Sequence, residues 1–119
     1  MSFLYSLAVV AMQVAAPQAA PPAPATLTMQ QQTALRCSVA IAMGAERQRA
    51  GGGEADWPDL TERGREFFVR SLAQLMDDTG MSREALMQAA AGEAAEMKDG
   101  KTLQQVMPAC LLMLNASGL

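Results

Sequence analysis

Two cysteines, Cys37 and Cys110, are the residues of this 119-residue chain whose type most directly implies chemistry. They lie far apart along the chain, which excludes a CxxC redox motif and a compact thiolate metal site, because both need sulfurs on one turn. In an exported protein such a pair predicts one structural disulfide. On the chain-entropy model, closing so long a loop stabilises the fold by about 4 kcal/mol.

The rest of the composition removes most catalytic chemistry. The chain has no histidine, which excludes a Ser-His-Asp arrangement and zinc sites built on imidazole. Aromatic residues make up 4% and the net charge is -3, which is unfavourable for nucleic-acid binding. Residues 72–86 have the spacing of a helix-turn-helix, but Asp77 and Asp78 would then face DNA phosphates. We therefore predict a non-enzymatic protein with no cofactor, no metal ion and no nucleic-acid partner.

The first 35 residues carry no charged side chain. Residues 3–16 are mainly apolar and shorter than the roughly 20 residues of a membrane span, which is typical of a signal peptide. Ala23 and Ala25 provide small residues before a cleavage site at Thr26; an uncleaved anchor or a buried helix is the alternative. We predict a signal peptide over residues 1–25, a single domain over 26–119, and a periplasmic or secreted location. Membrane contact is then transient, and the abundance of Ala and Arg favours a bacterial source.

Few β-branched residues follow the predicted signal peptide, so helices are favoured over strands. Glycine-bearing breaks separate four segments, at residues 28–50, 58–77, 82–97 and from 102 onward, with a kink or restart expected at Pro108. The prediction is an all-α bundle of about four helices with one disulfide. In an up-down-up-down bundle the first and last helices are antiparallel neighbours, which places Cys37 and Cys110 at similar heights.

The second segment carries the candidate binding residues. Phe67 and Phe68 are adjacent and point about 100° apart on a helix, so one ring is expected at a groove edge or on the surface. The alternative is a wide core stripe that buries both rings. With Arg63, Arg65 and Arg70 as a rim, an exposed ring has the composition of a protein-binding hot spot.

We predict a protein that binds another protein, and its size and predicted export suggest a chaperone-, inhibitor- or immunity-like role by analogy. The second interpretation is a small-molecule or lipid carrier with a cavity lined by Met and Phe. A closed cavity favours the carrier, whereas an exposed apolar patch favours a protein partner.

Overall fold

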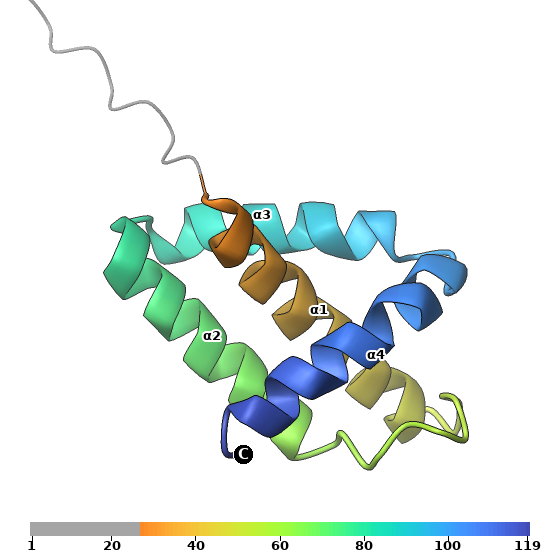
Figure 1. Ribbon diagram of the computed structural model, residues 1–119. Helices are drawn as coiled ribbons and strands as arrows, with labels where there is room; N and C mark the ends of the chain where they lie inside the picture. Colours follow the sequence, from red (N-terminus) through yellow and green to blue (C-terminus); the bar gives the residue numbers. More distant parts are fainter. Residues whose placement is uncertain (1–26) are drawn as a thin grey trace, which may run out of the picture.

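The structure is a computed structural model that describes residues 27–119, and these form four α-helices and no strand (Figure 1). The predicted all-α bundle with one disulfide is confirmed. The predicted signal peptide over residues 1–25 and its cleavage site at Thr26 lie outside the described residues. Within residues 27–119, no helix has both the length and the hydropathy of a membrane span. The helices are α1 (Met29–Arg49), α2 (Arg63–Thr79), α3 (Arg83–Glu96) and α4 (Lys101–Ala116).

Local sequence sets both ends of α1. The Thr28 hydroxyl accepts from the Gln31 N–H at 3.1 Å, and the Gln31 side chain accepts from the Thr28 N–H at 2.9 Å. This reciprocal capping box satisfies two N–H groups that a helix start leaves without partners. After Arg49 the chain turns through Gly51, whose φ of 84° is in the left-handed region that favours glycine. The predicted segment is confirmed to within one residue at each end.

The start of α2 differs from the prediction, which began this helix at Pro58. The Gln48 side chain donates to the main-chain oxygen of Pro58 at 2.8 Å and accepts from the N–H of Leu60 at 2.8 Å. The carboxylate of Asp59 meanwhile closes a turn onto the residue two positions further on. These bonds hold the segment in a non-helical path, so the helix begins at Arg63. Leu60 still reaches the core, fully buried, from the loop.

The last two helices follow the predicted segments, and α4 differs from its prediction at its start and at Pro108. Ser82 caps α3, since its hydroxyl accepts from the Ala85 N–H at 3.1 Å. The fourth segment was predicted to begin at residue 102, whereas α4 begins one residue earlier and Asp99 accepts from the Thr102 N–H at 3.1 Å. Of the kink or restart expected at Pro108, the restart does not occur, since α4 continues through this residue. Pro108 is exposed, so water can satisfy the carbonyl group that loses its N–H partner.

Helix α1 lies at the centre of the fold and contacts each of the other three helices. Helix α4 crosses α1 in Figure 1, and the disulfide between Cys37 and Cys110 joins them with Cα atoms 4.9 Å apart. The predicted adjacency of the first and last helices is therefore confirmed. The arrangement differs from an up-down-up-down bundle, because three helices pack around α1. Its buried residues are Leu35, Cys37, Ser38, Val39, Ala40, Ile41, Gly44 and Ala45.

Two glycines allow the close approach of helices to α1. A Cβ atom at Gly64 of α2 would lie 3.1 Å from Ile41 Cγ2 and 3.3 Å from Ala45 Cβ. A Cβ atom at Gly44 of α1 would lie 2.9 Å from the Met107 methyl group of α4. The missing side chains thus determine how tightly α2 and α4 pack against the central helix.

Candidate functional site

An open groove lies between α2 and α3, with α1 as its floor. The two outer helices diverge from the turn that joins them (Figure 1), so part of α1 stays uncovered between them. The groove has a volume of about 490 Å³, opens to solvent and is almost entirely apolar. Its lining residues are Val39, Ala42, Met43, Glu46, Arg47, Phe68, Met87, Ala90, Ala91 and Ala94.

The helical repeat explains why this groove is apolar. On α1 the lining residues recur at positions 39, 42, 43 and 46, and on α3 at 87, 90, 91 and 94. This spacing of three and four residues marks one face of a helix. On α1 that face is opposite to Cys37 and Gly44, which face α4. Helix α4 therefore covers the other side of α1 and leaves the groove open.

Large side chains border the groove, and small ones lie between them. Met87 of α3 is 45% exposed, and Met43 and Phe68 are half-buried. Between them, the alanines of α1 and α3 leave room near the helix backbones. Methionine adapts its shape to different neighbours, and an aromatic ring supplies a large apolar contact area. The groove can therefore accept bulky apolar side chains, and its only charged lining residues are Glu46 and Arg47.

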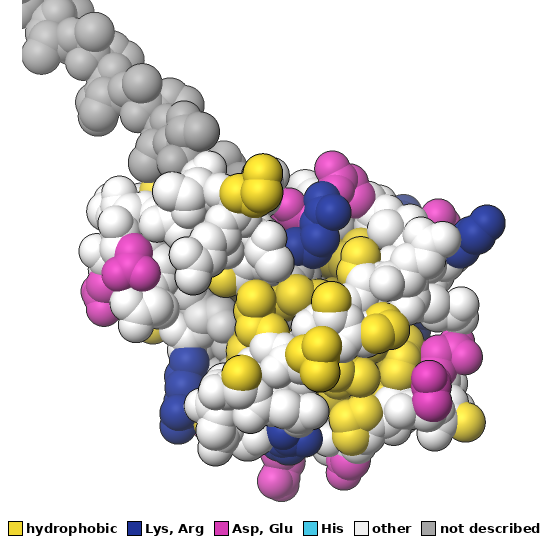
Figure 2. Space-filling model, in the orientation of Figure 1, with side chains coloured by type: hydrophobic (Ala, Val, Ile, Leu, Met, Phe, Trp, Pro, Cys, Tyr) yellow, Lys and Arg dark blue, Asp and Glu magenta, His cyan; other side chains and the backbone are white. Residues whose placement is uncertain are grey.

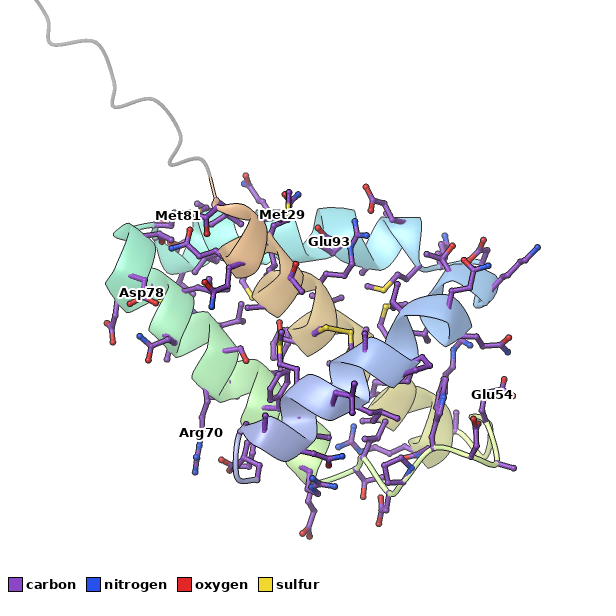
Figure 3. All side chains as sticks on the ribbon, in the orientation of Figure 1. Met29, Glu54, Arg70, Asp78, Met81 and Glu93 are labelled. Carbon is purple, nitrogen blue, oxygen red and sulfur yellow. A yellow bond between two sulfur atoms is a disulfide. The ribbon has the colours of Figure 1, made fainter. Side chains whose placement is uncertain are left out.

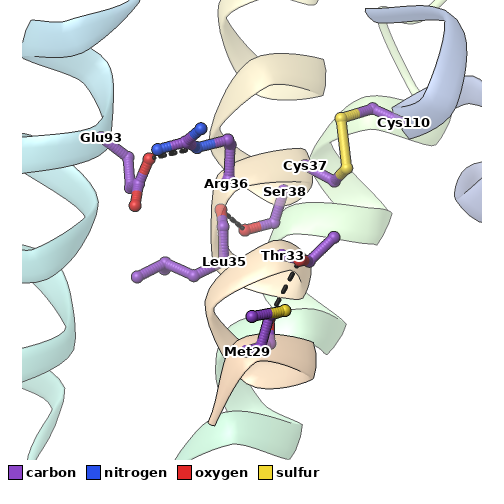
Figure 4. The surroundings of a disulfide bond; sticks show 8 residues. All are labelled: Met29, Thr33, Leu35, Arg36, Cys37, Ser38, Glu93 and Cys110. Carbon is purple, nitrogen blue, oxygen red and sulfur yellow. Dashed lines mark hydrogen bonds and ion pairs between the residues drawn. A yellow bond between two sulfur atoms is a disulfide. The ribbon is translucent and has the colours of Figure 1, made fainter. Parts of the chain in front are cut away.

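An ion pair fixes the α3 wall to α1. Arg36 Nε donates to Glu93 Oε2 at 2.8 Å, and Arg36 Nη2 donates to Glu96 Oε2 at 2.9 Å. Glu93 is buried, with 7% of its surface exposed, so its charge depends on this partner. The hydrogen bond with Glu93, together with the two negative charges, raises the pKa of Arg36. Figure 4 shows this pair on one side of α1 and the disulfide on the other, so α1 is fastened to α3 and to α4 independently.

The structure separates the two phenylalanines that the sequence analysis considered together. Phe67 is 5% exposed and belongs to the core, whereas the half-buried Phe68 forms part of the groove. One ring thus packs inside and the other lies at a groove, in agreement with the first of the two alternatives. Phe67 also borders a second, more polar cleft of about 750 Å³ between the N-terminal end of α1 and the C-terminal ends of α2 and α4.

The three predicted rim arginines occupy three different places. Arg63 donates to the main-chain oxygen of Leu119 at 2.9 and 2.7 Å and to Asn115 Oδ1 at 3.0 Å, which holds the chain after α4. Arg65 lies beside Phe68 in a shallow cleft next to the groove. Arg70 projects from α2 (Figure 3), borders the second cleft and pairs with an acidic residue one turn earlier at 3.6 Å. Of the five predicted binding residues, Phe68 and Arg65 lie together next to the groove, Phe67 and Arg70 border the second cleft, and Arg63 lies apart from both pairs.

Met43 and Met87 line the groove but were not predicted as binding residues from the sequence. The signal that could have found them is the repeat of Met87 with Ala90 and Ala94, which marks one α3 face as apolar. Periodicity cannot show that this face stays uncovered, because that depends on the angle between α2 and α3. Residues 27–119 contain no group of three or more acidic, histidine or cysteine side chains arranged to hold a metal ion.

Comparison of the chain with protein-family models, with curated proteins and with solved structures gives no match.

Proposed function

We propose that this protein is an exported, non-enzymatic bacterial protein that binds an apolar segment of another protein in the groove between α2 and α3. The observation that carries the proposal is the uncovered apolar face of α1, bordered by Phe68 and Met87. Burial of such a face in a complex is favourable at about 25 cal/mol per Å² of apolar surface. A chaperone-, inhibitor- or immunity-like role fits this kind of site.

The shape of the groove favours a helical or extended segment over a flat protein surface. The lining faces of α1 and α3 have the same residue spacing and together enclose a slot. Alanines at the base of this slot let an inserted side chain come near the backbones of both helices. A partner helix that carries apolar residues at i, i+3 or i+4 and i+7 matches this geometry. Phe68 and Met87 would then contact the partner's apolar side chains from opposite walls.

The proposed location rests on the predicted signal peptide and on the disulfide. A disulfide between buried sulfurs fits an oxidising compartment such as the periplasm or the extracellular space. Intact-mass measurement of the protein isolated from its own host should give a species that begins at Thr26. A species that retains Met1 and fractionates with membranes would replace the signal peptide with an anchor.

The groove is tested by photo-crosslinking in the native host. A benzophenone side chain at Met87 should yield a discrete adduct with one other protein, which mass spectrometry identifies. The same probe at Val69, a residue of α2 that is 57% exposed and lies outside the groove, is the matched control.

The identified protein is then purified and its affinity is measured directly. Phe68→Ser should weaken the complex by roughly 30-fold or more, as expected for a residue at a hot spot. Equal adducts from both probe positions, or an affinity that does not respond to Phe68→Ser, would contradict binding in the groove.

The second candidate function is a carrier of a small apolar molecule or lipid. The groove volume of about 490 Å³ supports it, because ligand pockets commonly measure about 300–1,000 Å³. Against it, the groove is open, whereas carrier sites surround most of their ligand. Native mass spectrometry separates the two, since a carrier should retain a small molecule that Met43→Asp removes.

A further inference from the structure

Arg47 is a charged residue of the groove lining that forms no ion pair within residues 27–119. The hydrogen bonds that arginine side chains donate in this part of the chain come from Arg36, Arg49 and Arg63. The other charged lining residue, Glu46, is paired with Arg49. Elsewhere, Figure 2 shows acidic and basic side chains interspersed around the edge of the described face over α4. Arg47 therefore leaves one uncompensated positive charge in an apolar groove.

The position of this charge is defined by Gly100. A Cβ atom at Gly100 would lie 2.9 Å from Arg47 Nη2 and 3.1 Å from Nη1, so the guanidinium rests against the main chain between α3 and α4. Arg47 is the last lining residue on α1, and Gly100 follows the last lining residue on α3, Ala94. The positive charge therefore lies at one end of the groove, and its half-buried side chain forms part of the lining.

Any segment that fills the groove removes water from this guanidinium. A charged group that is covered without a partner loses its hydration, which weakens binding. A carboxylate compensates for this loss, because it carries the opposite charge and accepts two parallel hydrogen bonds from a guanidinium. The acidic residues next to Arg47 and Gly100 already have partners, since Glu46 pairs with Arg49 and Asp99 accepts from the Thr102 N–H. The carboxylate must then come from the bound segment.

We propose that the segment bound in the groove is a helix with an acidic side chain one turn beyond its apolar residues, and that Arg47 binds this carboxylate. The spacing follows from α1, where Arg47 is one turn past Met43 at the end of the groove. The inference rests on the proposed function, because it specifies the chemistry of the groove's occupant. Arg47 is then a specificity-determining residue, since a purely apolar helix leaves its guanidinium covered and unpaired.

Selection from a phage library of random peptides, each displayed between two fixed linkers, tests the preference with the oxidised protein. The wild type should enrich peptides with apolar residues at i, i+3 or i+4 and i+7 and with Asp or Glu about one turn further on. Arg47→Glu should enrich Lys or Arg at that last position instead. Arg70→Glu is the matched control at an arginine of α2 outside the groove, and it should select the same peptides as the wild type. Circular dichroism checks that both variants fold.

Affinities then show whether the two charges contact each other. One enriched peptide is synthesised with its acidic residue and with the corresponding amide, and binding is measured by fluorescence anisotropy. Arg47→Gln should weaken binding of the acidic peptide by about 10-fold and binding of the amide peptide by much less, because that pair is already lost. The exchange in the peptide needs no variant of the protein, so it stays decisive if Arg47→Gln is unstable.

The possible failures are distinguishable. Enriched apolar peptides without an acidic residue, or an amide peptide that binds the wild type as tightly as the acidic one, would overturn the role of Arg47 and leave the groove as the binding site. If no enriched peptide loses affinity with Phe68→Ser, the proposed function fails and the inference fails with it. Binding of dodecanoate that depends on Arg47, without binding of any selected peptide, would overturn the inference in favour of a lipid.

Discussion

Reduction of the disulfide should remove a large part of the stability of this protein. Cys37 and Cys110 are 3% and 1% exposed and join α1 to α4 across a sequence separation of 73 residues. If both thiols are kept reduced, the sulfur atoms still fill their places in the core. The experiment therefore measures the covalent link with little change in packing.

The size of the effect follows from the length of the loop. On the chain-entropy model, a loop of 73 residues restricts the unfolded chain by about 15 cal/mol/K, which is about 4.4 kcal/mol at 25 °C. Domains of this size have total stabilities of about 5–15 kcal/mol. The reduced protein should therefore lose between about 30% and about 90% of its stability.

Urea denaturation of the oxidised and reduced forms measures this difference. The reduced chain exposes more surface when it unfolds, so the slope of free energy against urea concentration should also increase. The control is the double variant Cys37→Ala/Cys110→Ala, which should not respond to reductant. It should be less stable than the reduced wild type, because the substitution also empties core volume.

A difference of less than about 1 kcal/mol between the two forms would refute this reasoning. It would mean that the reduced unfolded chain already keeps α1 and α4 close together. A large difference with an unchanged urea slope would point to an effect on the native state instead.

Three further predictions concern single residues. Glu93→Ala should lower the free energy of unfolding by about 1–2 kcal/mol and Glu96→Ala by less than about 0.5 kcal/mol, because the two side chains are 8% and 62% exposed. Equal losses of stability for the two variants in urea denaturation would contradict this prediction. Gly92→Ala should raise the stability by about 0.5–1 kcal/mol, since a Cβ atom there meets nothing within 4 Å of it. Gly64→Ala should lower the stability by about 1–3 kcal/mol, since the new Cβ atom would lie 3.1 Å from a buried branched side chain. Thermal melts in which Gly92→Ala and Gly64→Ala change the stability in the same direction would show that α2 can shift. A main-chain N–H and a hydroxyl group donate to the Asp59 carboxylate, and these hydrogen bonds lower the pKa of the carboxyl group below 3.8. The ionised carboxylate therefore stabilises the fold above that pH, and this stabilisation is lost as the pH falls through the folded-state pKa. The difference in melting temperature between wild type and Asp59→Ala should therefore shrink from about pH 5 to about pH 2, and a constant difference would exclude the turn as its cause.

Features that depend on neighbouring residues were predictable from the sequence. The start of α1 is an example, since Thr28 and Gln31 lie within one turn and cap each other. The disulfide was predictable for another reason, because the chain offers only one pairing. The start of α2 was not, because the hydrogen bonds that keep Pro58 and Leu60 out of the helix come from Gln48 on another element.

The candidate site was predictable only in part. The sequence indicated that Phe67 and Phe68 could not both fit a narrow stripe, and Phe68 does line the groove. The groove itself depends on how far α3 diverges from α2, and the ion pair of Arg36 with Glu93 helps to set that position. This pair spans 57 residues, so no local pattern contains it.

The central position of α1 has a consequence for the time at which the fold can form. Synthesis delivers α1 first and α4 last, and 73 residues separate the two cysteines. At about 5–20 residues per second, Cys37 waits about 4–15 s for its partner. For that interval Cys37 has no partner within its own chain, and the surface of α1 that α4 later covers is still exposed. A chain that stops before Cys110 keeps an unpaired thiol in the helix that should become its core.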